Sequence, residues 1–128
     1  MKRLALLLCL LGAPLSAQIA GNDIAAACDH IKEADVRAGY CIGYIAGAWE
    51  GMKRGTAQVV MLSDPGKTAA EVDASTNALL GICMPVEVEH SQIVDVFLKY
   101  LDDTPSQRHF PARSLLHSAL LDAFPCRK

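Results

Sequence analysis

The sequence lacks the residue patterns on which most catalytic and metal sites are built. Its histidines include no pair at the i, i+4 spacing of helical metal ligands, and its cysteines include no CxxC pair. A GxSxG turn for a serine nucleophile is also missing. The adjacent acids Asp102 and Asp103 point apart on a turn, so they do not suit a general acid and base pair. We therefore predict no catalytic residue, no metal and no cofactor, and we do not expect an enzyme.

Long apolar runs and an excess of basic residues are missing too. The chain carries 12 Lys and Arg residues against 14 Asp and Glu residues, which is unlike the basic surface of a nucleic-acid-binding protein. The apolar run Leu4–Leu11 is far shorter than the ~20 residues of a membrane-spanning helix, and no later segment reaches that length without charge. We expect binding to neither nucleic acid nor the interior of a membrane.

The first 17 residues have the layout of a secretory signal peptide. Lys2 and Arg3 precede the apolar run, which ends in small residues before Ala17. We predict cleavage near Ala17, which would leave residues 18–128 as a single exported, soluble domain. Loss of two basic residues would make its net charge about −4.

Four cysteines lie beyond this leader: Cys28, Cys41, Cys83 and Cys126. An even number of cysteines in an exported chain predicts disulfides. Three pairings are possible, and the geometry of antiparallel helices favours Cys28 with Cys41 and Cys83 with Cys126. Disulfides would leave no free thiol for cysteine catalysis.

The most unusual feature is a row of glycines at four-residue intervals: Gly39, Gly43, Gly47, Gly51 and Gly55. Each glycine inside a helix costs roughly 1 kcal/mol relative to alanine, so the row predicts a close approach of another backbone. Such a row forms an i±4 groove that accepts a second helix. The groove could be filled by another helix of the same chain or by a partner or second copy, and Gly55 could also end the helix. Gly47→Leu should disrupt either the fold or a dimer.

Apolar periodicity predicts an all-α fold, a small disulfide-stabilised bundle of four to five helices. We expect helices over 23–34, 36–56, 88–101 and 111–124, with a shorter one over 69–80. The first should be capped by Asn22 or Asp23, and a break should lie near Asp35. The first half of the second helix is apolar nearly all round, which predicts a place in the middle of the bundle.

A turn between the helices is the candidate recognition loop. It contains Asp64, Pro65, Gly66 and Lys67, residue types that favour exposed turns. Loops on rigid scaffolds often bind partners, although many are only connectors. Arg108 and its neighbour His109 are expected to bind local carbonyls or an acid rather than a substrate.

The chain resembles the Rap/Tai family of immunity proteins from about residue 28 to 126. The most specific segments are CIGYIAG at 41–47 and then, in order, the CMP, YL, RH and FPC landmarks. The residues that carry the resemblance are Cys41, Gly43, Tyr44, Ile45, Gly47, Cys83, Pro85, Gln92, Val96, Tyr100, Leu101, Pro105, Arg108, His109, Ala112, Ala119, Leu120, Phe124, Pro125 and Cys126. Glu89 stands where the family often has a Ser or Thr helix cap, and the segment 57–82 has no counterpart among these landmarks.

The resemblance implies a small periplasmic helical protein, often a homodimer, that plugs the active-site cleft of a peptidoglycan amidase delivered by type VI secretion. The implied partner is a cognate amidase effector. The implied mechanism is steric exclusion by a rigid body, whose rigidity lowers the ordering cost of binding. A small periplasmic chaperone or envelope-stress protein without a toxin partner is the alternative interpretation.

Overall fold

The computed structural model describes residues 18–29, 31–33 and 35–126. The order of elements is α1 (Gly21–Cys28), η1 (Ile31–Glu33), α2 (Val36–Ser63), α3 (Ala69–Leu80), α4 (His90–Asp103), η2 (Pro105–Gln107) and α5 (Ala112–Ala123). The all-α prediction is confirmed, and the described part contains only two isolated β-bridges beside its helices. None of the described helices has both the length and the apolar character that a bilayer crossing requires. The predicted signal peptide over 1–17 lies outside the described residues.

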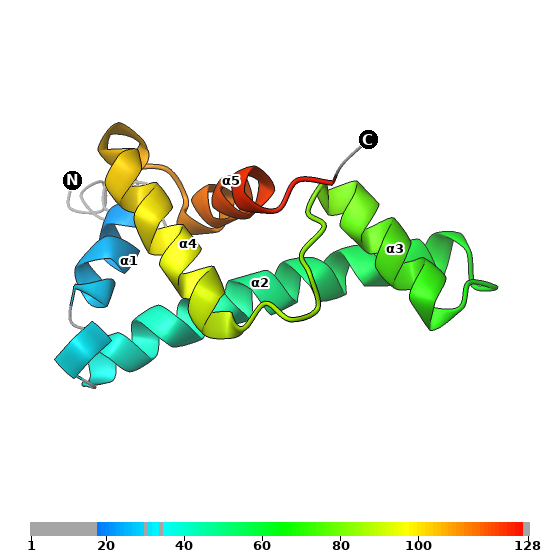
Figure 1. Ribbon diagram of the computed structural model, residues 1–128, viewed down its shortest axis with the longest axis horizontal. Helices are drawn as coiled ribbons and strands as arrows, with labels where there is room; N and C mark the ends of the chain where they lie inside the picture. Colours follow the sequence, from blue (N-terminus) through cyan, green and yellow to red (C-terminus); the bar gives the residue numbers. More distant parts are fainter. Residues whose placement is uncertain (1–17, 30, 34, 127–128) are drawn as a thin grey trace, which may run out of the picture.

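Helix α2 is the spine of the molecule and runs through 28 residues, a length of about 42 Å (Figure 1). Its N-cap is Asp35, whose carboxylate accepts hydrogen bonds from the backbone N–H groups of Arg37 and Ala38 at 2.9 and 3.0 Å. The prediction that this helix ends near residue 56 is wrong, because Gly55 continues it. The helix stops at Asp64 instead, where the following Pro65 disfavours the helical conformation.

Helices α1, α4 and α5 pack against one face of the first half of α2 and form a bundle with one apolar core. Its completely buried large side chains include Ile24, Ile45, Phe97, Leu101, Leu116 and Leu120. The expectation that the first half of α2 lies in the middle of the bundle is wrong. Only the face with Ala38, Cys41, Ile45 and Trp49 is buried, and the opposite face, which carries the glycine row, is exposed.

Gly21, at the start of α1, lies in close contact with the segment that leads into α5. A side chain on Gly21 would meet Leu115 Cδ1 at 2.5 Å and the Arg108 carbonyl at 2.9 Å, so only glycine fits there. The N–H of Gly21 donates to the carbonyl of Phe110 at 3.0 Å. Backbone hydrogen bonds therefore fix the start of α1 against the segment that leads into α5.

Two disulfides hold the bundle, with the pairing that helix geometry favoured. Cys28 joins Cys41 across α1 and α2, and Cys83 joins Cys126 across the segments that follow α3 and α5. The closed loops span 13 and 43 residues, worth about 3 and 4 kcal/mol by loop-closure entropy.

Helix α3 folds back along the second half of α2, and this pair projects beyond the bundle (Figure 1). We call the pair, residues 53–80 with its connecting loop, the arm. The expected helix over 69–80 coincides with α3. It ends at Gly81, which adopts a left-handed φ of 72° and lets the N–H of Ile82 reach the Asn77 carbonyl.

The other helix boundaries differ from prediction by a few residues. Helix α1 ends at Cys28 instead of residue 34, and the residues after it include the short η1 turn. Its cap is Ala20 rather than Asn22 or Asp23, and Asp23 instead accepts a hydrogen bond from the Ala20 N–H at 2.9 Å. Helix α4 is shifted by two residues to His90–Asp103, and Pro111 precedes α5 instead of opening it.

Candidate partner-binding surface

The glycine row lies on the outer face of α2 and is not covered by the described chain. A Cβ atom built on Gly39, Gly43, Gly47, Gly51 or Gly55 would meet nothing within 4 Å. All five are exposed, opposite the buried side of the helix. In the described part of the chain, no other helix fills this groove, so the intrachain interpretation of the row fails. A role in contact with another molecule stays a prediction.

Exposed apolar side chains lie on the same helix near both ends of the glycine row. Val36 is 89% exposed at the start of α2 and Leu62 is 76% exposed near its end, while Tyr40 is about half exposed. The rings of Tyr40 and Tyr44 lie 6.3 Å apart. Burial raises the pKa of Tyr44, with a smaller contribution from Tyr40. This face of α2 thus combines large apolar groups with a channel that lacks side chains.

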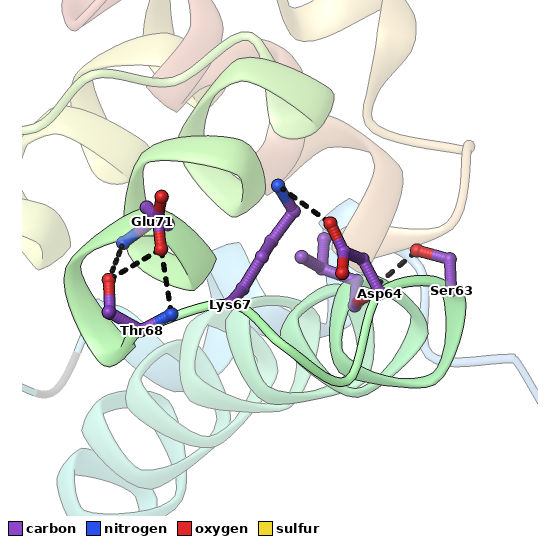
Figure 2. A network of polar contacts seen from close by, with 6 residues as sticks. Ser63, Asp64, Lys67, Thr68 and Glu71 are labelled. Atoms are coloured by element: carbon purple, nitrogen blue, oxygen red, sulfur yellow. Dashed lines mark hydrogen bonds and ion pairs between the residues drawn. The ribbon is translucent and has the colours of Figure 1, made fainter.

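The predicted recognition loop forms the tip of the arm. Asp64, Pro65 and Gly66 are exposed, whereas Lys67 is half-buried. Figure 2 shows the Lys67 side chain reaching back to the Asp64 carboxylate, with 3.4 Å between Nζ and Oδ2. The Lys67 N–H also donates to the Asp64 carbonyl at 3.3 Å. The loop is therefore a turn with its own internal contacts, and it presents an exposed Pro65 and Gly66 to solvent.

A capping box fixes the path of the chain from this loop into α3. The Thr68 N–H and hydroxyl donate to Glu71 Oε2 at 2.8 and 2.7 Å, and the Glu71 N–H donates back to Thr68 Oγ1 at 3.4 Å (Figure 2). The hydrogen bond from the Thr68 backbone is the main cause that lowers the pKa of the Glu71 carboxyl. The turn is thus closed by local polar contacts on the α3 side.

Sequence reasoning missed a groove of about 670 Å³ between α2 and α3. Ala57, Met61, Val72 and Thr76 supply apolar surface along it, and charged groups surround them. The lining positions on α2 recur every three to four residues, as do those on α3. That spacing marks two facing helices, but it was hidden because the helix over 36–56 was expected to stop before Ala57.

Ion pairs attach the groove's walls to each other and to the bundle. Lys53 on α2 pairs with Asp73 on α3, at 3.3 Å between Nζ and Oδ1. Glu50 lies 3.5 Å from His90 at the start of α4. All these side chains are at least partly exposed, so each pair contributes little to stability. Lys53 and Asp73 compensate each other at the rim, whereas Glu50 is compensated only when His90 is protonated.

The other side chains considered as catalytic or metal-binding candidates either bind structural partners or lie too far from one another to form a site. Arg108 donates from Nε to the Leu101 carbonyl at 2.7 Å and pairs with Asp102 at 2.8 Å, as expected of a group that binds local acceptors. His117 donates from Nε2 to the Leu80 carbonyl at 3.0 Å and so ties the end of α3 to α5. No group of three or more metal-ligating side chains occurs among residues 18–29, 31–33 and 35–126.

The chain matches the family of Rap1a immunity proteins over residues 20–126. The match spans the bundle, the arm and both disulfides, and the chain therefore belongs to this family. The family consists of immunity proteins rather than enzymes, and membership implies that the chain binds a toxin partner. Neither a curated protein nor a solved structure matched the chain.

Proposed function

We propose that the chain is a periplasmic immunity protein that binds a peptidoglycan amidase delivered by type VI secretion and blocks its active-site cleft. The observation that carries this proposal is the family match over residues 20–126. The family names a class of function, and the amidase is the partner that the Rap/Tai resemblance implies. Inhibition then needs no chemistry from the chain, because a protein seated over a cleft excludes the substrate by volume alone.

Export to the periplasm agrees with the two disulfides. Such bonds form and persist in oxidising compartments and are rare in the reducing cytosol. Cys28–Cys41 joins α1 to α2, and Cys83–Cys126 joins the segments that follow α3 and α5. The leader over residues 1–17 has the composition of a secretory signal, and we propose that residues 18–128 are the mature domain.

The arm is the element best suited to enter a cleft. It projects from a disulfide-held bundle and ends in a narrow turn with exposed Pro65 and Gly66. Because the Thr68–Glu71 capping box and the Lys67–Asp64 pair order this turn in advance, little conformational entropy is lost on binding. We propose that Asp64, Pro65, Gly66 and Lys67 contact the amidase.

The outer face of α2 is proposed as a homodimer contact. With Gly39, Gly43, Gly47 and Gly51 uncovered, a second helix could approach α2 more closely than on a face with ordinary side chains. Val36 and Tyr40 would lose exposed apolar surface in such a contact. This would offset the loss of helix stability that the glycines cause.

The test is protection in cells in which a peptidoglycan amidase effector, sought among the genes beside the one for this chain, is sent to the periplasm. Wild-type chain should restore growth and should purify with the toxin as a stoichiometric complex, while a form without residues 1–17, retained in the cytosol, should not protect. Growth arrest despite abundant, oxidised chain in the periplasm would contradict the proposal. Protection of unrelated, heat-damaged periplasmic proteins instead would favour the chaperone alternative.

A further inference from the structure

The two disulfides differ in how far solvent reaches them. Cys28 is 4% exposed and Cys41 is completely buried, so the bond between them lies within the core of the bundle. In the other disulfide, Cys83 is exposed and Cys126 is half-buried. A thiol exchanges with a disulfide by attack on one of its sulfur atoms, so the rate depends on access. In the folded chain, Cys83–Cys126 is therefore the accessible bond.

A hollow beside Cys83 gives an incoming thiol room to approach. It has a volume of about 470 Å³ and is lined by Cys83, Pro85, Ala123, Phe124 and Pro125. None of these side chains is charged, so none repels a thiolate. Attack on Cys83 would release the sulfur of Cys126, which lies 3.6 Å from the Asn77 carbonyl oxygen. Once protonated, the released thiol has a hydrogen-bond acceptor within reach.

This disulfide lies where the arm returns to the bundle (Figure 1). Backbone hydrogen bonds flank it, because the Cys83 N–H donates to the Phe124 carbonyl at 2.8 Å and the Cys126 N–H donates to the Gly81 carbonyl at 3.2 Å. Ile82, next to Cys83, is completely buried. These contacts would keep the two thiols close together after cleavage, so the bond could form again.

We propose that Cys83–Cys126 is an exchangeable disulfide, which the CxxC dithiol of a thiol oxidoreductase reduces in the folded chain. One thiolate of the dithiol attacks Cys83 Sγ, the bond to Cys126 breaks, and the Cys126 sulfur takes up a proton. The second thiolate of the dithiol then attacks the mixed disulfide, which releases Cys83 as a thiol and leaves the dithiol oxidised. Cys28–Cys41 stays intact throughout, because its sulfur atoms are buried.

Cleavage leaves the base of the arm dependent on noncovalent contacts. The end of α3 is then attached to α5 through the buried Ile82 and through His117, whose Nε2 lies 3.0 Å from the Leu80 carbonyl. Local opening at this junction should therefore become more frequent. The oxidation state of one disulfide thus controls how firmly the arm is attached to the bundle.

The first experiment compares the two disulfides in one folded, oxidised chain. Dithiothreitol is added, and the thiols that appear are trapped by alkylation and located by peptide mass spectrometry. Cys83 and Cys126 should be alkylated at least about tenfold faster than Cys28 and Cys41. Equal rates for both disulfides, or release of thiols only at denaturant concentrations that unfold the chain, would overturn the proposal.

A monothiol tests the direction of attack. Excess glutathione should form a mixed disulfide on Cys83 and leave the free thiol on Cys126, because Cys83 is the more exposed of the two. Glutathione attached to Cys126 instead would contradict the assigned step. The periplasmic location of the chain rests on the proposed function, but this chemistry is measured on the purified chain without a toxin, so either can fail alone.

Hydrogen exchange tests the effect on the arm. Selective reduction should lower amide protection most in residues 77–83 and 120–126, and reoxidation should restore it. The paired variant Cys83→Ser with Cys126→Ser should show the same local loss in the absence of reductant, and its Cys28–Cys41 bond should resist dithiothreitol. An equal loss in every helix, or no loss at all, would show that this disulfide does not control the attachment of the arm.

Discussion

The bundle and the arm share helix α2 but are stabilised by different means. In the bundle, apolar side chains from four helices are buried together and two disulfides close the ends. In the arm, the buried residues are Val60 on α2 and Thr76 on α3, and order comes from a capping box, a turn and an ion pair. Regions with few buried apolar contacts open more readily than cores. The protein thus combines a rigid platform with a projecting element that local contacts hold in shape.

The largest expected effect comes from the bundle core. Phe97→Ala should lower the free energy of unfolding by about 4 kcal/mol, because a completely buried ring is lost and a cavity remains. Val60→Ala in the arm removes less buried surface and should cost about 2 kcal/mol. Chemical denaturation measures both.

Native-state hydrogen exchange tests whether the arm opens separately from the bundle. Phe97→Ala should reduce amide protection in every helix, whereas Val60→Ala should reduce it mainly in α3 and the second half of α2. Equal losses across the whole chain in both variants would show that the arm has no separate opening, and the distinction drawn between the two regions would be wrong.

The next largest effect is expected from the disulfide that joins Cys28 to Cys41 near the start of α2. Replacing Cys28 and Cys41 together by serine opens a loop of 13 residues, and the expected loss of stability is about 3 kcal/mol. The arm is remote from this bond. Amide protection in α3 should therefore fall only because the whole chain unfolds more often. Equilibrium denaturation of the double variant beside oxidised wild type provides the measurement, and an unchanged midpoint would refute a stabilising role.

The sequence predicted the bundle better than the arm for physical reasons. Apolar periodicity and cysteine spacing report directly on buried faces, so the helices around Ile93 and Leu116 and both disulfide pairs could be found. The groove could not, because a glycine at position 55 is as compatible with the end of a helix as with its interior. Only tertiary structure shows that α2 continues to Ser63 and faces α3. Whether a glycine row is covered is likewise a question of topology, which local patterns do not answer.

A smaller effect, of opposite sign, is expected on the outer face of α2. Gly47→Ala should stabilise the isolated chain by about 1 kcal/mol, because the added methyl meets no described atom and alanine favours the helix. Because space is open at this position, Gly47→Leu should not disrupt the fold. Both Gly47→Ala and Gly47→Leu should weaken a dimer. Light scattering at several concentrations measures the oligomeric state, and Ala74→Leu on the exposed side of α3 is the matched control. A dimer that tolerates Gly47→Leu would exclude this face as its interface.

The smallest effect is the acid sensitivity of the arm. The folded-state pKa of Glu71 lies below its ordinary value of 4.5, chiefly because the Thr68 N–H stabilises the charged carboxylate. A lowered pKa contributes stability that is present above the unfolded-state value and is lost as pH falls through the folded-state value. Glu71→Gln removes the ionisable group. At neutral pH, α3 should therefore be more stable against local unfolding in wild type than in the variant, and this difference should vanish in acid. Amide protection of α3 across this pH range, corrected for intrinsic exchange, measures it, and a difference that persists at about pH 2 would mean that the cap acts without its charge. Because the Glu71 carboxylate is fully exposed, solvent screens it, and wild type and Glu71→Gln should not differ in the amide protection of the bundle at any pH.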